Sequence, residues 1–210
     1  METGLTTHGH SPHDPYHHGD LRNALLRAAR QMLEERGPAG LGLREIARRV
    51  GVSAPSAYHH FRNLEAIASG LVEQGSAEFS AALRDAAGQP NMLLRTGEAY
   101  VTFARANPAL YRLMFGEGLS IDVRNSQAMK ALRGDALQII KSRLPEDYSP
   151  DRQTVVALYL WSLVHGLALL VIDGHFDGPL PRNAIQQIIG LGGSGLASAG
   201  AARAERRNVR

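Results

Sequence analysis

Apolar residues recur at intervals of three and four along most of the chain, the spacing that places side chains on one face of a helix. The first such stripe covers residues 21–33, between Asp20, which can cap a helix, and Gly37, which can end one. A shorter stripe covers residues 43–50 and stops at Gly51. The pattern therefore predicts two amphipathic helices near the start of the chain.

A third helix of about two turns is expected from Ser53 to Phe61. Ser53 can cap it by accepting a hydrogen bond from the backbone N–H of Ser56. Pro55 is tolerated in the first turn, because the N–H that it lacks would have no helical partner there. Gly51 can adopt the left-handed conformation of a tight turn, so the second and third helices fit helix-turn-helix geometry.

The remainder of the chain shows the same helical spacing. No convincing strand, hairpin or internal repeat interrupts it, so the predicted fold class is all-α with about nine helices. The further helices are expected at residues 63–87, with Asn63 as the cap, and at 91–105, 108–115, 121–144, 150–172 and 181–191.

Charge and composition divide the chain into four parts. Residues 20–65 hold eight arginines against five acidic residues, whereas residues 66–191 are longer and more apolar. We expect a small basic module joined to a larger helical body through the fourth helix. Residues 1–19 form a His-rich arm that we expect to be flexible, and residues 192–210, rich in Gly, Ala, Ser and Arg, are expected to be a disordered tail.

Several classes of function are not expected. The chain has no cysteine, which excludes disulfides, thiol catalysis and iron–sulfur clusters. It shows no nucleophile elbow, phosphate-binding glycine loop or paired-carboxylate motif, so neither an enzyme nor a cofactor is predicted. The first residues lack the apolar core of a signal peptide, which favours a cytoplasmic location.

One apolar run, residues 155–172, is just long enough to cross a bilayer. It contains His165 and no cluster of Lys or Arg flanks it closely. A core helix covered on both faces fits these features better than a membrane span, so we expect no membrane association.

The third helix offers the side chains that suit a nucleic acid. Ala54, Ala57 and Phe61 would face inward, so that polar groups of the same helix face outward. Hydroxyl and imidazole groups can hydrogen-bond base edges or phosphates, and nearby arginines would supply a salt-dependent attraction. The candidate DNA-binding residues are Arg44, Arg48, Ser53, Ser56, Tyr58, His59, His60 and Arg62.

Residues 43–53 (LREIARRVGVS) and 58–61 (YHHF) closely resemble the DNA-binding domain of the tetracycline-repressor (TetR) family of bacterial regulators. Residues 16–22, 111–116 and 161–166 (WSLVHG) are similar to the branch of that family named for a Trp-His-Gly signature. The resemblance implies a homodimeric repressor of double-stranded DNA, whose body binds a small-molecule effector. Because one short recognition helix reads few base pairs, two copies and a palindromic operator are expected, with half-sites about 34–36 Å apart.

Two positions depart from the family pattern. Many members have Thr or Ser where Gly42 stands and Lys where Leu64 stands, and those residues commonly hold phosphates. We expect Arg44, Arg48 or Arg62 to take over this anchoring. Tyr58 and His60 are then expected at phosphates, and Ser56 and His59 near bases.

The body offers candidate effector contacts. Trp161 and His165 are one helical turn apart and can point into one cavity, although most such residues in any protein are simply core. An apolar or aromatic effector is expected there. The candidate ligand-binding residues are Tyr100, Phe103, Tyr111, Met114, Phe115, Met129, Trp161 and His165.

The long apolar helix is also expected to form the dimer interface. One of its faces would carry Leu158, Trp161, His165, Ala168 and Ile172, and the other Val156, Leu160, Leu163, Leu167 and Leu170. One face would join the core. The other, with residues 181–191, would form the symmetric four-helix interface typical of the family.

Three alternatives stay open at this point. An activator or an architectural DNA binder would use the same DNA chemistry. A metal-binding protein is suggested by His8, His10, His13, His17 and His18, but no carboxylates accompany them at ligand spacing, so no metal site is predicted. The arm could also lie along the DNA backbone.

Overall fold

The computed structural model describes residues 18–116, 123, 125–175 and 183–191, and every regular element in these ranges is helical. The predicted all-α class is confirmed. The helices are α1 (His18–Arg36), α2 (Leu43–Val50), α3 (Ala54–His60), α4 (Leu64–Ala87), α5 (Met92–Ala106), α6 (Pro108–Phe115), α8 (Gln127–Lys141) and α9 (Pro150–Ile172), with a short 3-10 turn η1 (Pro38–Gly40) and a last helix at residues 184–191. The predicted tail, and the predicted arm up to residue 17, lie outside the described residues.

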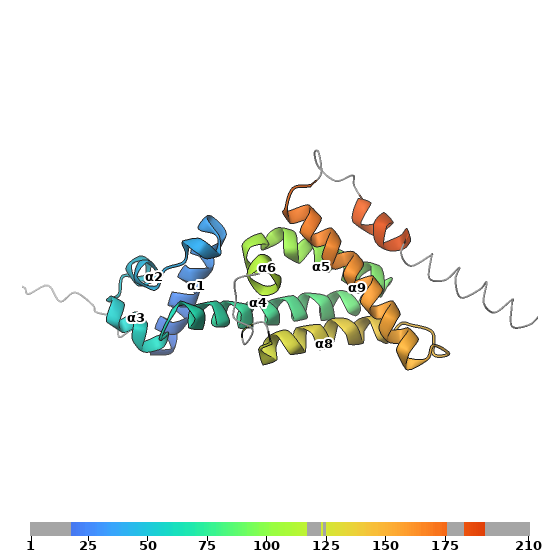
Figure 1. Cartoon of the computed structure of the whole chain (residues 1–210), viewed down its shortest axis with the longest axis horizontal. Coiled ribbons are helices and arrows are strands. Elements are labelled where there is room, and N and C mark those ends of the chain that lie inside the picture. Colours follow the sequence, from blue (N-terminus) through green and yellow to red (C-terminus); the bar gives the residue numbers. More distant parts are fainter. Residues whose placement is uncertain (1–17, 117–122, 124, 176–182, 192–210) are drawn as a thin grey trace, which may run out of the picture.

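The helices form an elongated molecule with two parts (Figure 1). Helices α1, α2 and α3 pack against one another at one end. Helix α4 starts there and runs into the larger part, where it packs against α5, α6 and α8, and α9 packs on α5 and α8. Helix α4 thus runs from the basic module into the body.

The local signals of the short helices are confirmed. Ser53 Oγ accepts from the N–H of Ser56 at 3.3 Å, and Asn63 Oδ1 accepts from the N–H of Ala66 at 2.9 Å. Gly51 lies in the left-handed region with φ 79°, which a side-chain-bearing residue would adopt only with strain. These contacts fix the angle between α2 and α3 and the start of α4.

Two predicted boundaries are wrong. Helix α1 begins at His18, so Asp20 is the third residue of the helix rather than the residue that precedes it. Helix α8 covers Gln127–Lys141 rather than residues 121–144, because Ser126 caps it by accepting from the N–H of Met129 at 3.3 Å. Apolar spacing continued across that cap and concealed the boundary.

One continuous core connects the two parts. It extends from Leu25 and Ile46 in the basic module to Leu110 and Met114 in the body. Gly75 of α4 lets α6 approach closely, since a Cβ there would lie 2.6 Å from Leu110 Cδ2. Helix α6 therefore packs against both α1 and α4.

Neither predicted face of helix α9 is buried as a whole. Its buried residues are Val156, Ala157, Val164, Leu167 and Ala168, while Leu158 is 45% exposed. The buried side therefore combines residues of both predicted faces, with Ala168 from one and Val156 and Leu167 from the other. An almost uniformly apolar helix has no polar side to reveal its orientation.

The outer face of α9 is apolar as well. Val155, Leu158, Tyr159 and Leu170 are between 44% and 65% exposed. The helix has the length and hydropathy of a membrane-spanning segment, and its inner face packs against α5 and α8.

Candidate DNA-binding and ligand-binding sites

Helix α3 presents part of its surface to solvent. Ala57 and Phe61 are buried and hold the helix on the module, whereas Ala54 is only half-buried. Tyr58 and His59 are exposed, and Ser56 and His60 are half-buried. The outer face of α3 thus carries a phenol and imidazoles next to the helix-turn-helix turn.

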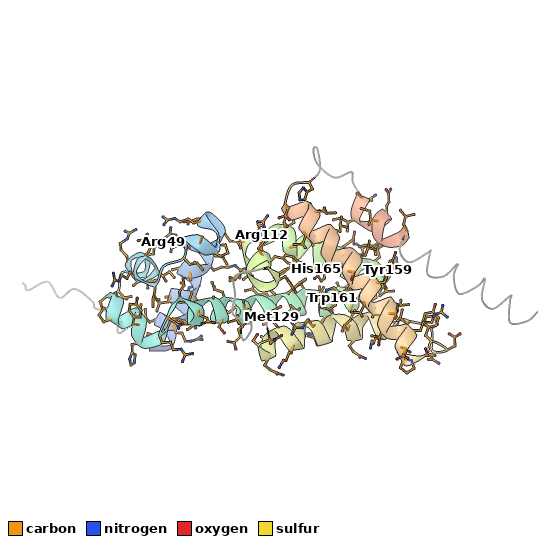
Figure 2. All side chains as sticks on the ribbon, in the orientation of Figure 1. Arg49, Arg112, Met129, Tyr159, Trp161 and His165 are labelled. Atoms are coloured by element: carbon orange, nitrogen blue, oxygen red, sulfur yellow. The ribbon has the colours of Figure 1, made fainter. Side chains whose placement is uncertain are left out.

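The arginines of α2 are not equally available. Arg48 donates two hydrogen bonds to Glu45, at 2.8 and 2.7 Å, while 73% of its side chain is exposed. Arg49 donates in the same way to Glu35 and ties α2 to α1, at 3.0 and 2.6 Å (Figure 2). The hydrogen bonds from these arginines lower the pKa of both carboxyl groups. A phosphate that binds Arg48 therefore competes with Glu45.

Arg44 and Arg62 differ from this pair. Both are exposed, and neither forms an ion pair within the described part of the chain. Arg62 comes directly before Asn63, which caps α4, and Arg44 lies in the first turn of α2. The structure leaves these two guanidinium groups with the least internal competition for a phosphate.

A hydrogen-bonded cluster lies where α5, α6 and α9 meet. Trp161 Nε1–H donates to Tyr100 Oη at 3.1 Å, and Tyr111 O–H donates to the same oxygen at 3.2 Å. Both tyrosine oxygens lie within reach of His165 Nδ1, at 2.9 Å from Tyr100 and 2.7 Å from Tyr111.

Burial keeps this cluster uncharged. It lowers the pKa of His165, raises the pKa of Tyr100 to about 12, and raises that of Tyr111 further. The cluster therefore offers neutral hydrogen-bonding groups rather than a charge at physiological pH.

Four of the predicted ligand contacts belong to the packed core near Phe79 of α4, a residue that was not predicted as a contact. Phe103 stacks on Phe79 with ring centroids 4.2 Å apart, and Phe115 lies 5.1 Å from the His165 ring. Met129 packs its sulfur 3.2 Å from Ser76 Oγ. Met114 is buried too, so none of these four residues lines the cavity described next.

A small cavity of about 50 Å³ lies beside the cluster, between α4, α5, α8, α9 and the helix at residues 184–191. Tyr100 and Trp161 are the two predicted ligand contacts that line it. Thr96 also lines it and was not predicted, although it shares a face of α5 with Tyr100. The described residues of the lining are Leu83, Leu93, Thr96, Gly97, Tyr100, Ala136, Ile140, Leu160, Trp161, Leu163, Val164 and Ile189.

The two parts are also joined by polar contacts that sequence reasoning missed. The carboxylate of Glu34 in α1 accepts from the backbone N–H groups of Ala109 and Leu110, both at 3.2 Å, in the first turn of α6. Arg30 of α1 donates to Asn107 Oδ1 at 2.7 Å, just before α6. A helix of the basic module thus caps the helix that carries Tyr111.

The other end of α6 is tied to α9. Arg112 donates to Asp173 Oδ1 and to the Ile172 carbonyl oxygen, both at 2.7 Å (Figure 2).

Metal ligands do not gather in the described ranges, where no group of three His, Asp or Glu side chains could hold an ion. The described ranges do not include His8, His10, His13 and His17 of the arm.

Residues 25–70 match the family model of bacterial regulatory proteins of the tetR family, and residues 93–189 match the tetracycline-repressor-like C-terminal domain. The chain belongs to the TetR family. An uncharacterised HTH-type transcriptional regulator of Bacillus subtilis, YobS, is 23% identical over 163 residues, which cover 76% of this chain and 83% of YobS. The Trp-His-Gly branch stays a prediction.

Solved structures agree with the TetR assignment. A protein of unknown function from Rhodococcus sp. RHA1 is 31% identical, with a TM-score of 0.69, over 85% of this chain and 94% of that one. A tetR-family transcriptional regulator from Streptomyces coelicolor is 23% identical, with a TM-score of 0.71, over 88% and 83% of the two chains. TetR-family proteins are DNA-binding transcriptional regulators with a helix-turn-helix, and they are not an enzyme family.

The lowered pKa of His165 predicts a pH dependence of stability. The unfolded chain takes up a proton near pH 6.5, whereas the buried imidazole resists protonation, so the free energy of unfolding should fall as pH drops below about 6.5. Urea unfolding of wild type and His165→Asn between pH 5 and 8 checks this. The variant should lose part of the slope, and the exposed control His175→Asn should keep it. Equal slopes in all three proteins would contradict the assignment.

Proposed function

We propose that the chain is a cytoplasmic, homodimeric one-component regulator. It binds a palindromic operator through α3 of each protomer, acts as a repressor, and is released by a small apolar molecule bound in the body. The observation that carries this proposal is the exposed face of α3, with Tyr58 and His59 outward, inside a module that matches the TetR family.

The DNA contacts follow from exposure and charge. Arg44 and Arg62 supply free guanidinium groups for phosphates, and Arg48 joins them when DNA displaces Glu45. Tyr58 and His60 hold the backbone, while Ser56 and His59 approach base edges in the major groove. Ser53 keeps its structural role as the cap of α3 and can meet a phosphate with its remaining donor.

A test of the phosphate contacts is the salt dependence of DNA binding. Arg48→Ala should weaken binding to all sequences about equally and reduce the slope of log K against log salt by about 1. Fluorescence anisotropy with an operator and a scrambled duplex at several salt concentrations measures both effects. Arg105→Ala, on the exposed side of α5, serves as the matched control. An unchanged slope for the Arg48 variant removes this residue from the phosphate set.

The dimer is proposed on the outer face of α9. Val155, Leu158, Tyr159 and Leu170 form an apolar surface that a monomer would expose to water, and the helix at residues 184–191 ends with Leu191 74% exposed. Two copies that pair α9 and residues 184–191 would cover this surface. Two α3 helices are then held at a fixed separation, which reads an inverted repeat.

Release of DNA requires a link between the effector and α3. Helix α4 is one link, since it runs from the module into the body. Helix α6 is a second, because Glu34 caps its first turn and the next residue, Tyr111, contacts His165. An effector that favours a different position of α6 and α4 shifts the dimer toward a state that does not match the operator.

The Glu34 contact can be measured alone. Glu34→Ala should lower the free energy of unfolding by about 1–3 kcal/mol, because the partly buried N–H groups of Ala109 and Leu110 lose their acceptor. Glu73→Ala, at an exposed position of α4, should change stability by less than about 0.5 kcal/mol. Urea unfolding monitored by Trp161 fluorescence compares them, and equal stabilities would show that the contact contributes nothing.

The DNA-binding role and the sign of regulation are tested separately. The DNA-binding role is supported if a selected duplex binds the wild-type protein and if this binding is lost when α3 is altered. Placing that operator over or upstream of a reporter promoter distinguishes repression from activation.

A further inference from the structure

Thr96 of α5 has an unusual environment. It is 8% exposed, and its hydroxyl has no hydrogen-bond partner in the described part of the chain. Threonine in a helix can donate to the carbonyl oxygen one turn back, but Thr96 does not. Buried polar atoms are nearly always partnered, so an unpartnered hydroxyl on a cavity wall indicates a contact that a bound molecule would complete.

The other walls of the cavity define what kind of molecule would fit. Among the described residues they are aliphatic side chains and the backbone of Gly97, with the exceptions of Thr96, Tyr100 and Trp161. Tyr100 and Trp161 already hydrogen-bond each other. None of the described residues that line the cavity is charged, so a carboxylate, phosphate or ammonium group would find no counter-charge among them and would enter at high cost.

We infer that the effector is an uncharged aliphatic molecule with a single neutral oxygen, such as an alcohol or ketone, and that Thr96 is the residue that selects this oxygen. The inference rests on the proposed function, in which the body binds an effector. It narrows the apolar or aromatic class expected from the sequence to aliphatic molecules.

The cavity also limits the shape of this molecule. At about 50 Å³ it is far smaller than the 300–1,000 Å³ typical of drug-sized sites, so a slender chain fits better than a fused ring system. A longer chain would displace Ile189, which covers the cavity from the helix at residues 184–191. Trp161 lines the same wall and reports occupancy through its fluorescence.

The test uses 1-butanol, 1-hexanol, 2-hexanone, hexane and hexanoate as probes of the full-length protein, without DNA. Binding is followed by Trp161 emission, and wild type is compared with Thr96→Val, Thr96→Ser and the exposed control Thr102→Val. Valine has the shape of threonine without the hydroxyl. Thr96→Val should therefore weaken 1-hexanol and 2-hexanone binding about tenfold and leave hexane binding unchanged.

The other variants separate chemistry from folding. Thr96→Ser should stay within about threefold of wild type for 1-hexanol, because it keeps the hydroxyl. Thr96→Val should also unfold at a temperature about 2–4 °C higher in the absence of probe, since it removes an unpartnered polar atom. Thr102→Val should match wild type in every measurement.

The outcomes are distinct. Equal effects of Thr96→Val on 1-hexanol and hexane, or tighter binding of hexanoate than of 1-hexanol, would overturn the inference, as would the absence of binding by every neutral probe. If no neutral probe binds but the protein still binds the operator, the ligand inference fails and the proposed DNA-binding role is unaffected. Thr96-dependent binding of 1-hexanol that never weakens DNA binding keeps the ligand class and contradicts the proposed coupling.

Discussion

Leu158→Asp should turn the proposed dimer into a monomer and reduce operator affinity at least about 100-fold. Leu158 is 45% exposed on the outer face of α9, among Val155, Tyr159 and Leu170. A carboxylate at the centre of an apolar interface would be buried without a partner, which opposes association strongly. A monomer then holds one α3 and reads only half of a palindrome.

Sedimentation or light scattering measures the first effect against the 22.7 kDa mass of one chain. The matched control is Ala81→Asp, which adds the same carboxylate at an exposed position of α4 and should remain dimeric. A Leu158→Asp protein that keeps both the dimer mass and operator affinity would place the interface elsewhere. Since Leu158 does not belong to the core, the circular dichroism of this variant should match wild type.

The second large effect is expected in α3. Replacing Tyr58 and His60 together with alanine should lower operator affinity at least about 100-fold at constant salt, because these two side chains are proposed to position α3 on the phosphate backbone. The two side chains are exposed and half-buried, respectively, so their removal opens no large cavity in the module. Anisotropy titrations with operator and scrambled duplexes measure the loss, which should appear with both duplexes because phosphate contacts carry no sequence information.

Two controls show whether the loss comes from the altered face of α3 rather than from a general effect of the substitutions or from misfolding. His175→Ala, an exposed histidine after α9, should bind the operator like wild type. The double variant should retain the dimer mass and a cooperative unfolding transition. Unimpaired retention on the operator would mean that the outer face of α3 does not contact DNA.

The helix-turn-helix could be predicted from local chemistry. Ser53, Gly51 and Asn63 act within a few residues of their own position, and each does in the structure what its residue type favours. The inward positions of Ala57 and Phe61 followed from the same short pattern. The fold class and helix α3 could therefore be predicted, because they depend on short-range sequence patterns.

Other features depend on contacts between distant segments. The cap on α6 joins Glu34 to Ala109 and Leu110, which lie 75 and 76 positions later in the chain. No pattern near Glu34 in the sequence indicates this contact. The buried side of α9 could not be predicted, because apolar residues surround the helix on all sides. The aromatic residues expected around an effector, such as Phe103, pack on Phe79 instead, while the small cavity depends on Thr96, whose missing partner only the structure reveals.

The most direct test of the central claim is selection of bound DNA from a random duplex pool by the wild-type protein. Two α3 helices per dimer predict an enriched inverted repeat with half-sites about 34–36 Å apart, or a multiple of one turn, and protection of both halves in footprinting. Enrichment of no sequence, or of a single site without symmetry, would contradict the account.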